Sequence, residues 1–297
     1  RTLVPYRRPD AGPTIRPDES SMQADKYQDY MYDLVKRVVD EIGPRPACSE
    51  AERKLGRMLC EGWRPICDRV ETEPFTCRPG AFLGVIRVSV VLFFASIVLY
   101  WFYPFAAFVV AVLSLVALIF ELVRYREFID FLYLPEQGEN IVGTIRPRGE
   151  TRRRVIVSGH QDSAYEFRLW RLFGNAAVPI MILALLGILT AVAGSLAKTI
   201  AYLGGSEGAV AYTVIGIVMA AFAPPAGLFL FFLSDKAVPG AMDDMSGIAI
   251  VDATGRCLHE SRNGGGFYPE NTEGILLATS SADADLRGAK RQVKKPK

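Results

Sequence analysis

Histidine and aspartate stand close together at the end of one β-rich run of this chain. His160 and Asp162 are two positions apart, and the pleat of a strand points such side chains to one face. The carboxyl end of a strand is also where open α/β sheets place their sites. A metal-binding histidine commonly gives its other ring N–H to a carboxylate, a role that Asp162 has the spacing for. The pair indicates either a metal site or an ordinary surface histidine beside an aspartate.

A second acidic segment follows much later in the chain. Asp243 and Asp244 come directly after a Pro-Gly turn and precede a helical run that extends to about His259. Either aspartate can cap this helix, with Ser246 as a competitor for that role. Each of the two motifs therefore has a plain structural explanation when it is taken singly.

Long uncharged runs separate these polar segments. No charged residue occurs from Val88 to Phe120, and a helix of that length would be about 50 Å long. A hydrocarbon core is only about 30 Å thick, and Pro104 lies near the middle of the run. The sequence thus predicts one transmembrane hairpin over residues 82–123 and, from two further uncharged runs, a second over residues 172–234.

The charges that flank the apolar runs predict how the chain is oriented. Most lie on the side of the polar segments, and the hairpin tips offer only Lys198. By the positive-inside rule we expect an integral, multi-pass membrane protein whose polar domain faces the cytoplasm. Each hairpin also returns the chain to the side that it left, so His160 and Asp243 can meet in one domain. The flanking charges are Arg87, Arg124, Arg126, Arg168, Arg171 and Lys236.

The composition excludes several classes of protein. With 297 residues, 50% of them hydrophobic, the chain is neither a disordered nor a collagen-like polymer. Lys and Arg total 34 against 32 Asp and Glu, a balance too even to indicate nucleic acid as a partner. The five cysteines are odd in number and form no CxxC pair. They argue against a disulfide framework or a structural zinc knuckle and favour a reducing compartment.

The polar segments have the pattern of one α/β domain that is interrupted twice. Strand, helix and strand signals follow one another, which indicates a mixed sheet with flanking helices. Helices are expected at 24–42 and, after a capping pattern at Ser49 and Glu52, up to Trp63; strands are expected at 69–77, 140–145, 155–158 and 274–279. The predicted organisation is a disordered tail (1–23), a domain in three parts (24–81, 124–171, 235–297) and transmembrane hairpins between them (82–123, 172–234).

Taken together and in order, the two acidic motifs resemble those of a known family. Gly-His-x-Asp-Ser followed by Pro-Gly-Ala-x-Asp-Asp-x-Ser-Gly is similar to the co-catalytic di-zinc aminopeptidases and carboxypeptidases, the bacterial leucyl aminopeptidase-like zinc exopeptidases. Residues 41–52 and 139–143 also look like that family's helices and strand before the histidine. The resemblance covers about 24–81, 135–167 and 235–292 and leaves out the membrane runs.

This resemblance implies a membrane-spanning zinc exopeptidase that acts on a peptide substrate. His160 matches a zinc ligand, Asp162 matches the carboxylate that orients it, and Asp243 matches the aspartate that bridges two zinc ions. Asp244 is then a neighbour of the site and not a ligand. In such a site the two zinc ions lower the pKa of a bound water and polarise the scissile carbonyl.

The chain departs from the family pattern where the general base is expected. Ala282 stands at the position of the glutamate that takes the water's proton, Asp283 at that of a zinc-binding glutamate, and Asp285 where glycine is common. Loss of a general base typically slows a reaction by about 100- to 10,000-fold. The family's two further ligands would lie beyond Lys297, so we expect a truncated or degenerate site.

Three functions are therefore considered for this sequence. The first is a membrane-anchored zinc aminopeptidase that is impaired or incomplete in this chain. The alternative is a non-catalytic, peptidase-like binding or scaffold protein of the membrane, for which Ala282 is the main argument. The third is a four-helix membrane protein with regulatory polar parts. Against the third, the spans carry no charged residue near the bilayer centre, where an ion route usually needs one.

Overall fold

A mixed sheet organises the polar residues. The structure is a computed structural model that describes residues 17–205, 210–264 and 266–293. Within these residues the main sheet has four strands, in the spatial order β1 (Arg69–Cys77), β2 (Glu136–Ile145), β6 (Thr272–Thr279) and β3 (Arg153–His160). The first two pairs are antiparallel and the last is parallel, so β3 and β6 end at the same edge. The predicted strands and the α/β class are confirmed.

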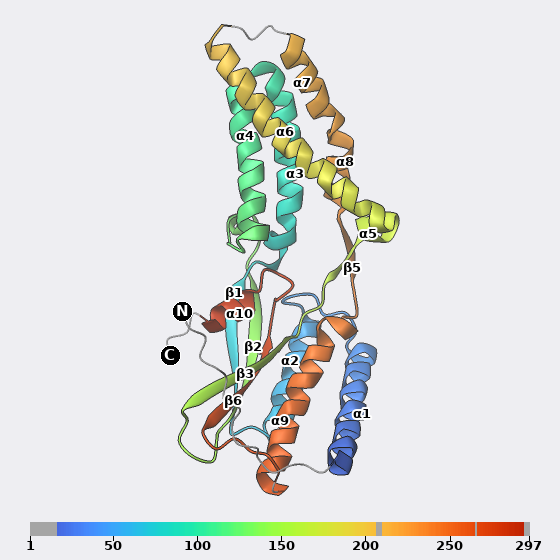
Figure 1. Cartoon of the computed structure of the whole chain (residues 1–297), viewed down its shortest axis with the longest axis vertical. Coiled ribbons are helices and arrows are strands. Elements are labelled where there is room, and N and C mark those ends of the chain that lie inside the picture. Colours follow the sequence, from blue (N-terminus) through green and yellow to red (C-terminus); the bar gives the residue numbers. More distant parts are fainter. Residues whose placement is uncertain (1–16, 206–209, 265, 294–297) are drawn as a thin grey trace.

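Two helices, α2 (Glu50–Trp63) and α9 (Ser246–Gly264), cover one face of this sheet in the described part of the chain, and α1 (Pro17–Glu41) packs against α9 (Figure 1). Their apolar sides meet the sheet in one buried cluster. Burial of each large apolar side chain contributes about 1.5–3 kcal/mol relative to its exposure. The cluster includes Leu34 of α1, Trp63 of α2, Ile248 of α9, and Ile141 and Leu276 of the sheet.

The start of α1 differs from the predicted tail. Residues 1–16 of the tail that we expected at 1–23 lie outside the described residues, whereas 17–23 form the first turns of α1. The helix begins at Pro17, which suits a first turn because the missing N–H has no helical acceptor there. Proline and aspartate in a polar stretch were interpreted as a loop, but Pro17 and Asp18 form the start of a helix.

Four helical stretches of the described chain are long and apolar enough to cross a membrane: Pro79–Phe102, Pro104–Val123, Arg168–Leu203 and Val210–Phe231. This is compatible with a multi-pass membrane protein. The break that Pro104 predicts is present, since α3 (Pro79–Phe102) ends just before it and α4 (Pro104–Leu118) begins with it. Together with α6 (Ala177–Leu203) and α7 (Val210–Ala221), these helices form the bundle in the upper half of Figure 1.

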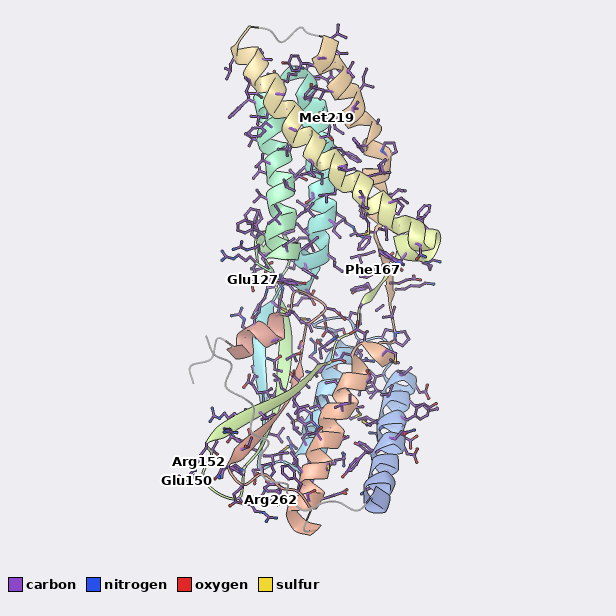
Figure 2. The ribbon with its side chains drawn as sticks, viewed as in Figure 1. Glu127, Glu150, Arg152, Phe167, Met219 and Arg262 are labelled. Carbon is purple, nitrogen blue, oxygen red and sulfur yellow. The ribbon has the colours of Figure 1, made fainter. Side chains whose placement is uncertain are left out.

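Small residues occupy many of the buried positions of the bundle, together with a few large side chains such as Phe93, Tyr100 and Met219. Ser89 and Ser114 are buried between α3 and α4, and each hydroxyl donates to the other residue's carbonyl, at 3.2 and 2.9 Å. Small interfacial residues let helices approach closely in lipid, where burial of apolar surface gives no driving force. Figure 2 shows Met219 within this bundle and Glu150, Arg152 and Arg262 at the opposite tip of the molecule.

The second hairpin is joined to the polar domain by a two-stranded ribbon. β4 (Tyr165–Phe167) leads out from the His160 motif, and β5 (Leu233–Ala237) leads back to the Asp243 motif; the two strands pair in antiparallel fashion. The chain therefore leaves and returns at one place, as the topological argument requires.

The shorter helices are α5 (Arg168–Phe173), η3 (Gly174–Ala176), α8 (Ala223–Gly227), η4 (Leu228–Phe231), η5 (Ala241–Met245), η1 (Ile119–Val123), η2 (Asp130–Leu132) and α10 (Arg287–Val293).

Candidate metal centre

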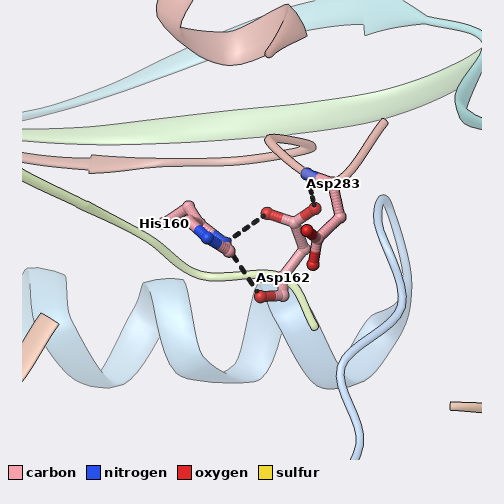
Figure 3. Close-up of side chains that lie close together, drawn as sticks. All are labelled: His160, Asp162 and Asp283. Carbon is pink, nitrogen blue, oxygen red and sulfur yellow. Dashed lines mark hydrogen bonds and ion pairs between the residues drawn. The ribbon is translucent and has the colours of Figure 1, made fainter. Parts of the chain in front are cut away.

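The candidate site lies at the edge where β3 and β6 end. His160 is the last residue of β3 and pairs with Thr279, the last residue of β6. The segment after β3 and the segment after β6 therefore start at the same edge of the sheet. His160, Asp162 and Asp283 lie side by side there (Figure 3). One ligand atom from each of these three residues lies within 4.8 Å of the others.

The imidazole of His160 is held between two carboxylates. Its Nδ1 lies 3.1 Å from the Asp162 carbonyl oxygen and 3.3 Å from Asp162 Oδ1. Its Nε2 lies 3.2 Å from Asp243 Oδ1. When Nδ1 donates to Asp162, the lone pair on Nε2 is left to face Asp243 and a cation between them.

Asp162 is fully buried, and the loop after β6 holds its carboxylate. The backbone N–H groups of Ala282 and Asp283 donate to Asp162 Oδ1 and Oδ2, both at 2.9 Å. These bonds fix the carboxylate against the ring of His160. The geometry suits a residue that positions a ligand, which is the role that the resemblance implied for Asp162.

Asp283 brings a half-buried carboxylate with one unsatisfied oxygen in the described part of the chain. Among the described residues, its buried Oδ2 has no hydrogen-bond donor. Burial, and next the charge of Asp162, raises the pKa of Asp283 to about 7. A buried oxygen without a donor is costly unless something else satisfies it, and a metal cation beside His160 would do so.

Asp243 and Asp244 have different environments although they are neighbours joined by a cis peptide bond. The Asp243 side chain is 75% exposed and faces His160. Asp244 instead accepts from the backbone N–H groups of His160 (2.9 Å) and Gly247 (3.1 Å), so it ties the end of β3 to the first turn of α9. Of the two roles that the sequence left open, Asp244 takes the helix cap and Asp243 is the one free to bind a cation.

The electrostatic field of the site is negative. Burial alone lowers the pKa of His160, but the hydrogen bond and charge of Asp162, followed by the charges of Asp283 and Asp244, raise it to about 9. An imidazole is stabilised in its charged form when carboxylates surround it. The same field favours a divalent cation, which would replace the proton.

Arg45 was not singled out from the sequence, although it lies at the centre of the site's support. Its guanidinium is buried and donates to the carbonyl oxygens of Gln161 (2.9 Å), Pro239 (3.0 Å) and Gly240 (3.2 Å). It therefore links the His160 motif to the Asp243 motif. The available signal was the Gly-Pro-Arg-Pro segment, which the resemblance included without a role for the arginine.

Glu52 is a second supporting residue that sequence reasoning assigned only to a capping box. The Ser49 hydroxyl accepts from the Glu52 N–H (3.1 Å), as expected. The Glu52 carboxylate accepts instead from the N–H groups of Cys48 (2.7 Å) and Ser281 (3.0 Å), and so holds the loop before Ala282. Burial, and next the charge of Asp162, raises the pKa of Glu52 to about 8.

A cavity of about 570 Å³ opens beside the site, where the polar domain meets the bundle. Ala282 and Asp283 line it, and Ala282 contributes a methyl group where the resemblance placed a general base. The remaining walls are mostly apolar and come from the segment before α2, from the base of α3 and from the ribbon. They include Pro79, Phe82, Leu83, Phe167 and Leu233.

Asp285, which the resemblance places where glycine is common, has a backbone conformation that suits glycine. Its φ is +77°, in the left-handed region that glycine adopts most readily and that aspartate tolerates better than most residues. Its carboxylate accepts from Lys290 Nζ at 2.7 Å. Aspartate is thus accommodated at this position of the loop.

No protein-family model matches the chain, and no curated protein matches it.

Proposed function

We propose that this chain is a membrane-anchored zinc metallopeptidase of the aminopeptidase type, with turnover limited by the absence of a general base. The observation that carries the proposal is the arrangement around His160. One ring nitrogen is held by the buried Asp162, and the other faces Asp243 at 3.2 Å. Asp283 adds a buried carboxylate oxygen without a donor in the described chain.

The donor set fits zinc. Zinc binds imidazole nitrogen and carboxylate oxygen at about 2.0–2.2 Å, and catalytic sites combine three such protein ligands with an open position. His160 and Asp283, whose ligand atoms lie within 4.8 Å of each other, would hold the ion together with Asp243, whose Oδ1 lies 3.2 Å from His160 Nε2. Asp162 would orient His160. Zinc, when bound, supplies a water of lowered pKa and polarises the scissile carbonyl.

The rest of the site acts on the substrate. The cavity beside Asp283 is lined by the base of α3 and by the ribbon, so it receives a peptide at the level of the bilayer surface. Its apolar walls favour apolar side chains next to the bond that is cleaved. The arginines that flank the spans, such as Arg87 and Arg168, favour a polar domain on the cytoplasmic side.

Ala282 favours the second candidate, a non-catalytic binding or scaffold protein with the same site. A methyl group neither accepts nor donates a proton, and loss of a general base slows hydrolysis by roughly 100- to 10,000-fold. Such a protein would keep the metal and the peptide cavity and would lose turnover. Metal binding is common to both candidates, so it is tested first.

The first experiment measures zinc per chain by elemental analysis after purification in detergent. We expect near-stoichiometric zinc in the parent chain and a large loss in His160→Ala and Asp243→Ala. His259→Ala is the matched control, because this other histidine lies on α9 and should leave the zinc content unchanged. Background zinc in the parent chain, or equal zinc in all variants, would overturn the proposal.

The second experiment separates the two candidates. Ala282→Glu restores a carboxylate at the cavity wall, and we expect turnover of aminoacyl-amide substrates to rise by about 100-fold or more in zinc-loaded protein. Ala284→Glu, on the same wall two residues further on, is the control for an added charge. If Ala282→Glu binds zinc normally and still shows no gain, the chain is better described as a binding protein.

A further inference from the structure

Two cysteine side chains are in contact beside the candidate metal centre. Cys48 precedes α2, Cys77 ends β1, and their Sγ atoms lie 3.2 Å apart. Both thiols are free and buried, and both contact the Ser281 hydroxyl, at 3.2 and 3.6 Å. The sulfurs of a disulfide are about 2.05 Å apart, so a movement of roughly 1 Å is enough to join them.

We propose that Cys48 and Cys77 are a redox-active pair that closes to a disulfide and fastens the segment before α2 to the end of β1. The oxidant is a small peroxide. One thiol attacks a peroxide oxygen, which yields a sulfenic acid and one water. The second thiol then attacks the sulfenic sulfur and releases a second water. The two sulfurs lose two electrons in all, and hydrogen peroxide is reduced to two waters.

The surroundings of the pair make Cys77 the thiol that reacts first. The hydrogen bond from Cys48, together with the Ser281 hydroxyl and the charge of Arg287, lowers the pKa of Cys77. The same Cys48–Cys77 hydrogen bond, and burial, raise the pKa of Cys48. A thiolate is the reactive form, so the first attack comes from Cys77 and Cys48 resolves the sulfenic acid.

A small oxidant can come close to this pair. Ala47 and Ser49, the chain neighbours of Cys48, line the 570 Å³ cavity, and so does Pro79, two residues after Cys77. The remaining cysteines, Cys60, Cys67 and Cys257, differ because none of them is hydrogen-bonded to a second cysteine among the described residues. They serve as internal controls in one sample.

Closure of the pair bears on the loop that carries Asp283. Ser281, which contacts both sulfurs, has a left-handed backbone (φ +57°) and donates its N–H to Glu52. The next two N–H groups hold Asp162. A disulfide between Cys48 and Cys77 lowers the conformational entropy of the unfolded chain and so stabilises the folded state. We therefore expect the melting temperature of the polar domain to rise by roughly 5 °C.

The test uses the full chain in detergent. Protein that has been reduced and freed of reductant is treated with stoichiometric hydrogen peroxide, alkylated, digested without reductant and analysed by mass spectrometry. We expect one linked peptide that joins Cys48 to Cys77, with Cys60, Cys67 and Cys257 alkylated, and a higher melting temperature that a reductant reverses. These readouts need neither bound zinc nor turnover, so they are independent of the proposed function.

Matched variants complete the experiment. Cys48→Ser and Cys77→Ser should each abolish the linked peptide and the thermal shift, whereas Cys60→Ser should change neither. If Cys48→Ser fails to fold, the parent chain still decides the matter through its linked peptides. Two alkylated thiols at Cys48 and Cys77 after peroxide, or a link that involves another cysteine, would overturn the proposal.

Discussion

The loop after β6 has an acidic cluster on each side, and the two clusters differ in their countercharge. The site cluster surrounds His160 and consists of Asp162, Asp243, Asp244 and Asp283. The joint cluster surrounds Arg287, where η1 and η2 at the end of the first hairpin meet the polar domain, and consists of Glu121, Glu127, Asp130 and Asp285. Figure 2 shows Glu127 of the joint cluster where the bundle meets the polar domain.

In the joint cluster the protein supplies a permanent cation. Arg287 is 2% exposed and donates to both carboxylate oxygens of Asp130, and its Nη2 lies 3.6 Å from Glu121. Lys290 adds a second positive charge, 2.7 Å from Asp285. The site cluster instead has a single imidazole, whose positive charge depends on a proton that a bound metal would replace. An acidic cluster that already holds a guanidinium is structural, and one that lacks it is the better candidate for a metal.

The largest effect that this comparison predicts is a loss of folding stability in the Arg287→Ala variant. Removal of one partner from a buried ion-pair network leaves uncompensated charge and destabilises a protein by about 3–5 kcal/mol. We expect a loss of this size in denaturant unfolding of the polar domain, with zinc still bound in the folded fraction. Arg57→Ala, in an exposed ion pair with Glu50, should change little. Similar stability of the two variants would contradict a structural role for the joint cluster.

Removal of zinc should have the next largest effect, and it should depend only on the site cluster. A ligand at 100 times its Kd stabilises the folded state by about 2.7 kcal/mol. Chelator-treated protein should therefore gain about that much on addition of zinc, as measured by thermal unfolding. The gain should vanish in His160→Ala and persist in Lys290→Ala. Loss of the gain in Lys290→Ala would show that the two clusters are not separate.

Local patterns in the sequence predicted much of the fold. The length of the first apolar run indicated two helices, because the thickness of a membrane sets the length of a helix that crosses it. Pro104 indicated the break between them, because proline lacks the N–H that a helix needs. Short apolar runs near turn residues indicated the strands, and the expected even number of crossings allowed His160 and Asp243 to meet. All of these features depend on residues that are near one another in the chain or on a count of crossings.

Long-range polar contacts could not be predicted in the same way. Arg287 is matched with Glu121 and Asp130, more than 150 residues earlier, and no local pattern marks such a pair. Arg45 donates to backbone carbonyl oxygens, which every residue has. The types of its partner residues therefore could not indicate its role. The contact between Cys48 and Cys77 likewise depends on the register of β1 beside α2, which the spacing of the cysteines does not reveal.

The smallest expected effect is at Asp285, the member of the joint cluster that lies two residues after Asp283. Asp285→Gly relieves the left-handed backbone, worth roughly 1 kcal/mol, and removes the partner of Lys290. Lys290 is partly exposed and also donates to the Tyr125 carbonyl, so its charge stays solvated. The two effects offset, and we expect the free energy of unfolding to stay within about 1 kcal/mol of the parent, with zinc unchanged. Asp285→Asn loses the ion pair and keeps the strained backbone, so it should be less stable than Asp285→Gly. If denaturant unfolding gave the reverse order, the left-handed backbone would not be the main cost at this position, which would contradict this explanation.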